Sequence, residues 1–268
     1  MQRPQWLVLL GAAALFCLMY FGLDHVPPDR RGQTAPSAIG LTATSAQALI
    51  KEALPTLDAR AEAEIHGYSK MLDAATSDAR RTEVFEQLSG AWYRAGRPAL
   101  AGHYAQQIAE LNPSDTTWGI AATTYTLCLR RDSLSAKQRA LCSERAVAAY
   151  EQAISLAPES STHKVNLALH YADNPPADNP MRGIRMLLDL NAENPDDVAV
   201  LVQLGRLALQ TGQNDKAVVR LTRAAGLQPD NPTAQCLLAE AASRTGQAAL
   251  ASASEKACRA LYSGNDNS

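Results

Sequence analysis

From residue 45 onward, apolar residues recur at intervals of three and four, and short polar turns separate the successive runs. The clearest case is residues 198–231, where two amphipathic runs meet at Gly212 and end at Pro229. Such spacing indicates α-helices with one apolar face. Glycine suits the turn between them, and proline stops the second helix. The pattern therefore predicts a hairpin of two short helices.

The same design can be traced before and after this stretch. Three earlier units end in proline, at Pro113, Pro158 and Pro195. Two units carry extra residues, around 129–144 and at 173–181, and the last unit has Glu255 where a large apolar side chain is expected. A polar final helix suits the end of a stacked array, which faces water. We predict five hairpins, at residues 82–115, 116–160, 161–197, 198–231 and 232–262.

The hairpin at 198–231 resembles the tetratricopeptide repeat (TPR) family, whose period is about 34 residues. The resemblance rests on small and large apolar residues at the family's spacing, namely Leu201, Leu204, Gly205, Ala208, Ala217, Leu221, Ala224 and Pro229. It implies an all-α fold, a right-handed α-solenoid of about five helical hairpins over residues 79–262. The family is known as a protein–protein interaction scaffold that holds a partner in a concave groove made by the first helices. The resemblance names no partner.

Residues 45–78 precede the repeats and also show helical spacing. A first short helix ends at Pro55, and Thr56 is expected to cap a second helix. The second helix has an apolar stripe formed by Leu57, Ala61, Ile65, Tyr68 and Leu72. A stripe of this kind needs a covering surface. We interpret the segment as an N-terminal cap of the solenoid, and a short dimerising coiled coil is the alternative.

The N-terminal residues suggest attachment to a membrane. Residues 6–23 contain no charged side chain, and as a helix they would rise roughly 27 Å, close to the thickness of a bilayer core. We predict a membrane anchor at 1–24 and a flexible linker at 25–44, which holds three prolines and two glycines. A cleaved signal peptide is the alternative for the anchor. Residues 263–268 are expected to form a disordered tail.

Composition supports a helical and non-nucleic-acid-binding protein. The chain is 46% apolar but only 5% aromatic, which favours close helix packing over β-sheet. The net charge of −2 gives no electrostatic basis for binding nucleic acid.

A candidate groove follows from the first helices of the third and fourth hairpins. The helix beginning at Val198 is apolar almost all round, more than a half-exposed helix needs. We predict that a partner polypeptide binds there, against Val165, Leu169, Val202, Arg206, Leu209 and Gln210. The alternative is that other parts of the chain cover this surface. Lys164 and Asn166 resemble part of a family clamp for C-terminal carboxylates, but the set is not repeated on adjacent helices, which argues against such a clamp.

Four cysteines and two histidines are candidate site residues. Cys128 and Cys142 bracket the second-hairpin insertion, and Cys236 and Cys258 lie on the two helices of the last hairpin. Each pair suits either a disulfide, as in an oxidising compartment, or two buried thiols. No zinc spacing occurs. His163 and His170 lack a third ligand, and we interpret them as surface histidines.

No catalytic motif is present, so we predict a protein that is not an enzyme, with no cofactor, metal or small-molecule substrate. The expected function is a single-pass, membrane-anchored scaffold in the bacterial cell envelope, with its solenoid in the periplasm. It would bind a protein or peptide. More specific alternatives are an assembly factor for c-type cytochrome maturation and a translocon-associated chaperone. A remote alternative is an enzyme whose site lies in the insertions.

Overall fold

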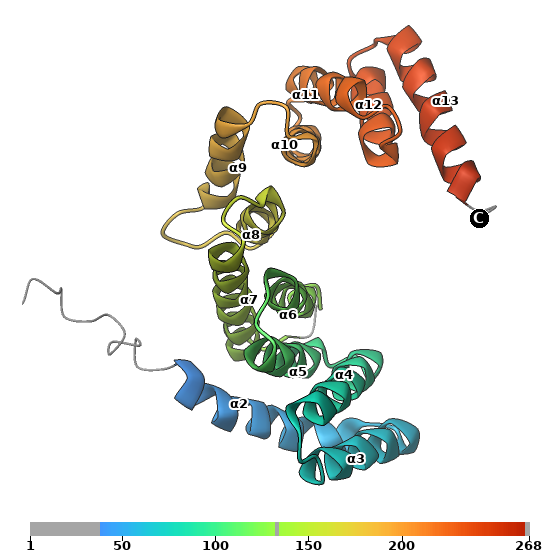
Figure 1. Cartoon of the computed structure of the whole chain (residues 1–268). Coiled ribbons are helices and arrows are strands. Elements are labelled where there is room, and N and C mark those ends of the chain that lie inside the picture. Colours follow the sequence, from blue (N-terminus) through green and yellow to red (C-terminus); the bar gives the residue numbers. More distant parts are fainter. Residues whose placement is uncertain (1–37, 132–133, 266–268) are drawn as a thin grey trace, which may run out of the picture. The chain divides into compact units, whose positions relative to one another are not determined.

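The computed structural model describes residues 38–131 and 134–265, which form helices joined by turns and loops (Figure 1). The chain divides into two compact units, Met1–Pro55 and Thr56–Ser268. The predicted anchor at 6–23 lies outside the described residues. Among the residues that the structure does describe, no helix is long and apolar enough to span a bilayer.

In the first unit, the described part is α2 (Ala38–Ala53), followed by a 3-10 turn (Leu54–Thr56) that reaches into the second unit. Helix α2 begins inside the predicted linker at 25–44. The prolines that suggested a linker all precede Ala38, and the residues from Ala38 to Thr44 contain none. Without proline, this short stretch keeps its backbone N–H donors and can extend the helix toward the N-terminus.

The second unit opens with α3 (Ala59–Asp73). Its cap is Asp58, whose carboxylate accepts a hydrogen bond from the Ala61 backbone N–H at 2.8 Å, and not Thr56 as the sequence suggested. The Thr56 hydroxyl accepts a hydrogen bond from Arg97 at 2.6 Å instead. Helix α3 packs against α4, and Ile65 is its most deeply buried apolar side chain.

Five helical hairpins follow and confirm the predicted all-α solenoid of TPR type. They are α4 (Asp78–Arg94) with α5 (Pro98–Leu111), α6 (Asp115–Cys128) with α7 (Ala136–Leu156), α8 (Ser161–Asp173) with α9 (Arg182–Glu193), α10 (Val198–Gln210) with α11 (Asn214–Leu227), and α12 (Pro232–Arg244) with α13 (Ala248–Asn265). Each helix packs against the helices before and after it in the chain.

Small residues allow the two helices of a hairpin to cross closely. A Cβ added at Gly205 on α10 would lie 2.6 Å from Cγ of Leu221 on α11, a side chain with no exposed surface. At the turn between these helices, Gly212 has a φ of 71°, which L-residues rarely adopt. The Gln213 N–H then donates to the Ala208 carbonyl at 2.8 Å and closes the end of α10.

The two insertions are built differently. In the second hairpin, the extra residues lengthen the second helix, because α7 has 21 residues where α11 has 14. In the third hairpin, the extra residues form the loop between α8 and α9. Arg182 follows this loop as the first residue of α9, and its guanidinium carbon lies 4.0 Å from the centroid of the Tyr171 ring on α8. Neither insertion prevents its two helices from pairing.

The last helix, α13, is largely polar on its outer surface. Glu255 is exposed and pairs with Arg259 one turn later at 2.5 Å. Ser254 is buried at the same level of the helix, 4% exposed. The polar residue at the apolar position of the repeat therefore faces water, as expected for a terminal helix.

Candidate functional site

Three of the six predicted groove residues belong to the hydrophobic core. Val165, Val202 and Leu209 are each 4% exposed. Val202 and Leu209 share a buried cluster with Ala234 and Leu238 of α12. These side chains are therefore not available to line a surface, and a groove based on them is not what the structure shows.

The burial has a simple cause in the stacking of hairpins. Helix α10 contacts α8 and α9 of the preceding hairpin, its own partner α11, and α12 of the next one. A helix surrounded on several sides needs apolar residues on several sides. The surplus of apolar residues from Val198 onward serves this packing.

The other three predicted residues lie nearer the surface. Leu169 is half-buried and packs against the cluster that contains Val165 and Leu187. Arg206 is half-buried and donates from Nε to the Gln203 side-chain oxygen at 2.9 Å. Gln210 is exposed at the end of α10. They do not line either of the two cavities described for this chain.

The larger of those cavities, about 460 Å³, lies between the first helices of the second and third hairpins, α6 and α8. Its walls are mostly hydroxyl and amide side chains, with one exposed aliphatic residue and one histidine–aspartate pair. The lining residues are Asp115, Thr116, Gly119, Ile120, Thr123, Thr124, Ser160, Thr162, His163 and Asn166. Apart from Asn166 and the histidine, sequence reasoning missed them. The one available signal was the run of threonines along a helix that the repeat places next to the groove.

Local sequence fixes both walls. Ser114 caps α6 and forms a reciprocal capping box with Thr117, which sets the start of the helix. Gly119, one turn further, leaves room for the ring of His163 from α8, since an added Cβ would lie 2.6 Å from its Cε1 atom. Ser160 precedes α8 and makes no side-chain capping bond, so its hydroxyl is not used by the helix.

His163 and Asp115 tie the two walls together. Nε2 of His163 lies 3.1 Å from Oδ2 of Asp115, and the histidine is 8% exposed. This hydrogen bond is the main reason that the pKa of Asp115 is lowered. Nδ1 of His163 is buried and has no partner among the described residues. Because a carboxylate only accepts, Nε2–H of His163 donates this hydrogen bond to Asp115.

The remaining lining groups keep hydrogen-bonding capacity toward the cavity. The Thr123 hydroxyl donates to the Gly119 carbonyl at 2.9 Å and the Thr124 hydroxyl to the Ile120 carbonyl at 2.7 Å, so both oxygens remain acceptors. The Asn166 amide makes no hydrogen bond to any described residue, which leaves its donors and its acceptor free. Ile120 is 57% exposed and adds an apolar contact. The cavity thus offers neutral hydrogen-bonding groups together with the Asp115 carboxylate.

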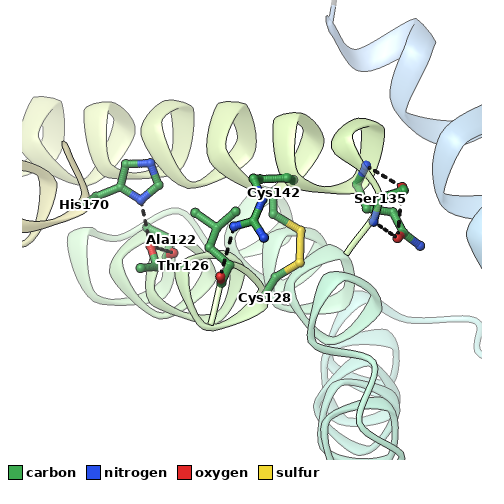
Figure 2. Close-up of a disulfide and its surroundings, with 9 residues drawn as sticks. Ala122, Thr126, Cys128, Ser135, Cys142 and His170 are labelled. Carbon is green, nitrogen blue, oxygen red and sulfur yellow. Dashed lines mark hydrogen bonds between the residues drawn. A yellow bond between two sulfur atoms is a disulfide. The ribbon is translucent and has the colours of Figure 1, made fainter. Parts of the chain in front are cut away.

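His170 is also buried, contrary to the interpretation of both histidines as surface residues. It is 1% exposed, and its Nδ1 lies 3.2 Å from Oγ1 of Thr126 (Figure 2). Its Nε2 lies 3.1 Å from Oγ of Ser143. The Thr126 hydroxyl donates to the Ala122 carbonyl at 3.0 Å, so it accepts from Nδ1–H, and Nε2 accepts from Ser143. Burial lowers the pKa of His170. Among the described residues, no group of three potential ligands could hold a metal ion.

The cysteines beyond the N-terminal segment lie in two bonded pairs. A disulfide joins Cys128 at the end of α6 to Cys142 in α7, across the base of the second-hairpin insertion (Figure 2). A second joins Cys236 of α12 to Cys258 of α13. The first pair has no exposed surface and packs with Leu129. Each bond links the two helices of one hairpin.

Comparison with known proteins gives one family match. Residues 182–240, from α9 into α12, match a family model described as Tetratricopeptide repeat. No curated protein sequence matches the chain.

Several solved structures resemble the fold. MamA 41-end from Desulfovibrio magneticus RS-1 is 16% identical, with a TM-score of 0.44, over 72% of this chain and 99% of that one. PilW, described as a widely conserved type IV pilus biogenesis factor, is 19% identical, with a TM-score of 0.45, over 70% and 80%. The C-terminal part of a TPR repeat-containing protein from Cytophaga hutchinsonii is 13% identical, with a TM-score of 0.46, over 83% and 80%. At these values the likeness does not indicate what this chain binds.

The family match covers the most regular hairpin and parts of both its neighbours. Further hairpins precede and follow it, each with two paired helices. Gly205 and Leu221, on which the resemblance rested, meet at a helix crossing. These observations support a protein of tetratricopeptide repeat type, with the matched repeats at residues 182–240.

Proposed function

We propose that the protein is a non-enzymatic scaffold that binds an extended segment of a partner polypeptide in the cavity between α6 and α8. The observation that carries the proposal is the uncommitted Asn166 amide, set among hydroxyl groups in a cavity of about 460 Å³. Main-chain peptide groups need one donor and one acceptor each, and an asparagine side chain supplies both. Ile120 offers an apolar contact for a side chain of the same segment.

The mainly uncharged lining indicates what kind of segment fits. The Asp115 carboxylate accepts a hydrogen bond from His163, and the lining side chains other than this pair are uncharged. Binding through neutral groups depends on shape and on main-chain hydrogen bonds, and only weakly on salt. We therefore expect an uncharged, extended stretch of the partner and not a strongly acidic or basic tail.

The proposal includes attachment to a membrane through residues 6–23, with the solenoid in the periplasm. The two bonded cysteine pairs support an oxidising compartment. An alkaline-phosphatase fusion after Ser268 tests this topology. Activity of the fusion is the expected result, whereas an inactive fusion alongside a fluorescent cytoplasmic reporter at the same position would refute a periplasmic solenoid.

Site-specific photo-crosslinking in native membranes tests the binding site. A photo-reactive amino acid replaces Ile120, and a matched variant carries it at Val219, a β-branched residue of α11 that is 71% exposed and outside the cavity. We expect a defined polypeptide adduct from position 120 and none of the same mass from position 219. Identical adducts from both positions, or only crosslinks within the chain, would contradict the proposed site.

A second variant connects the adduct to Asn166. Asn166→Ala in the crosslinking background removes the amide, and loss of hydrogen bonds to a desolvated main chain should lower the adduct yield about fivefold or more. Thr222→Ala on α11, where the threonine is exposed, is the control and should leave the yield unchanged. Equal yields from the two variants would exclude Asn166 as a binding residue.

A further inference from the structure

The insertion of the second hairpin, described at residues 129–131 and 134–144, forms a platform that the regular hairpins lack. It extends the start of α7 and adds the loop before it. The Cys128–Cys142 disulfide closes the base of this loop, and Leu129 is buried beside it with Leu134 and Ala99 packed against the same cluster. Ser135 caps α7 through a reciprocal capping box with Gln138. Such bracing suggests that the platform holds particular side chains in place.

The side chains at the surface of this platform are mainly cationic. Arg130, Arg131 and Arg139 are exposed, and Arg139 donates to the Leu129 carbonyl at 3.3 Å. Arg131 lies against the turn between α4 and α5, since its Nη1 is 2.9 Å from the place of a Cβ on Gly96. Arg97 follows that glycine directly. Arg131 thus brings two turns together, and the four arginines that these turns and the start of α7 carry are here called the arginine edge (Arg97, Arg130, Arg131 and Arg139).

The arginine edge, like Arg60, Arg182, Arg185, Arg206 and Arg220, lacks the carboxylate partners that six other described arginines have. Within residues 38–131 and 134–265, none of its four guanidinium groups forms an ion pair with Asp or Glu. In the same part of the chain, six other arginines do, namely Arg80, Arg81, Arg94, Arg223, Arg244 and Arg259. The chain as a whole carries a net charge of −2, so the cationic edge is a local departure. Gathered like charges repel one another unless an anionic surface compensates them.

We propose that the arginine edge docks on the anionic lipid headgroups of the membrane to which the chain is attached. Arg97 hydrogen-bonds Thr56 at 2.6 Å, and Thr56 is the first residue of the second unit, at which the chain arrives from its N-terminal segment. The arginine edge therefore lies where the solenoid joins the segment leading to the predicted anchor. It consists of turns and a helix start, which suits a planar partner. The inference rests on the proposed membrane attachment.

Hydrogen exchange of the full chain in nanodiscs tests the docking. One set of nanodiscs contains phosphatidylcholine alone, and the other contains phosphatidylcholine with phosphatidylglycerol. With the anionic lipid, amide exchange in residues 128–145 should slow at least about fivefold, because the binding free energy of one arginine at an anionic leaflet corresponds to a factor of that size. High salt should abolish the difference between the two lipids. Equal exchange in the two lipids overturns the proposal.

Matched variants separate charge from folding. Replacing all four arginines of the edge with Gln should remove the lipid effect, whereas replacing all four with Lys should preserve it. A charge-matched control, with Arg80, Arg81, Arg223 and Arg259 changed to Gln, should behave like the unmodified chain. Loss of the lipid effect in the Lys variant or in the control would show that headgroup charge is not what the edge recognises.

Two further outcomes distinguish the alternatives. If the chain does not enter nanodiscs of either composition, the proposed membrane attachment fails, and the docking inference fails with it. If the chain enters but polyglutamate protects residues 128–145 where phosphatidylglycerol does not, the edge binds an acidic polypeptide, which overturns the docking inference and leaves the attachment standing.

Discussion

Replacing Gly183 with alanine should loosen the third hairpin. Gly183 stands in the first turn of α9, where that helix crosses the backbone of α8. An added Cβ would overlap the Ala168 carbonyl oxygen and the Ala172 nitrogen, and it would lie 2.9 Å from the Tyr171 carbonyl carbon. All three atoms are backbone atoms. Relief therefore requires one helix to move, since no side chain can turn away.

The size of the effect follows from the movement needed. Ordinary contacts of carbon with backbone atoms require roughly 3.5 Å, so α9 would retreat from α8 by about 1 Å. This retreat loosens Leu187, which has no exposed surface and packs against Val165 and Ala168. Overpacking of this kind costs about 1–3 kcal/mol, and backbone contacts place Gly183→Ala near the upper end. Alanine's better helix propensity offsets little at the first turn of a helix.

Gly67→Ala is the matched control for this prediction. Gly67 lies in the interior of α3, and an added Cβ would meet nothing within 4 Å. Here only the helix propensity of alanine acts, so we expect stabilisation of about 0.5–1 kcal/mol. Urea denaturation followed by far-ultraviolet circular dichroism measures both changes. Hydrogen exchange in α8 and α9 locates the loss, because a repeat array can open one hairpin at a time.

A Gly183→Ala variant as stable as the unmodified chain, measured beside a stabilised Gly67→Ala variant, would refute the reasoning. It would mean that α9 does not approach the backbone of α8 as closely as the structure indicates. A loss of protection outside the third hairpin would likewise show that the effect has another origin.

Three further predictions concern the rest of the solenoid. Changing both Cys128 and Cys142 to Ala removes a bond with a sequence separation of 14 and should cost about 3 kcal/mol in urea denaturation, as should reduction of that bond alone. Leu221→Ala, at a side chain with no exposed surface, should cost about 3 kcal/mol in the same assay. Burial, followed by the charge of Arg145, lowers the pKa of His103 from 6.5 to about 4. The unfolded chain therefore binds a proton at His103 more tightly than the folded chain does. The contribution of this residue to stability is complete above pH 6.5 and is lost as the pH falls toward 4. His103→Gln should flatten this pH dependence, measured by urea denaturation at a series of pH values.

The repeat architecture could be predicted from the sequence because its determinants are local. The spacing of apolar residues predicted the helices, and in the hairpin at 198–231 Gly212 and Pro229 predicted where the two helices end. Small residues at particular repeat positions, such as Gly205, predicted where the two helices of a hairpin cross closely. The start of α3 was wrong by two residues, since Thr56 and Asp58 both suit a cap and only the tertiary contact with Arg97 assigns Thr56 another partner.

The candidate site could not be predicted in the same way. A sequence shows that a helix has apolar residues on many sides, but not which neighbours cover them. The cavity between α6 and α8 depends on residues that are 48 positions apart, as in the Asp115–His163 pair. Single polar residues such as Thr116 and Asn166 carry no periodic signal, and their joint role appears only when the two helices are placed side by side.

The contrast between α10 and α6 indicates where specific function lies in a solenoid of this kind. In the most regular hairpin, the apolar side chains of α10 are buried against the neighbouring helices. A regular repeat therefore stabilises the fold but leaves few side chains exposed for binding. The second hairpin departs from the repeat in two ways, with threonines along α6 and with the braced insertion before α7. Because each hairpin contacts mainly its neighbours, such departures can be accommodated in one unit without disturbing the others. The cavity and the arginine edge both involve this second hairpin, and this makes it the part of the chain where a substitution at the surface should change binding while leaving the fold intact.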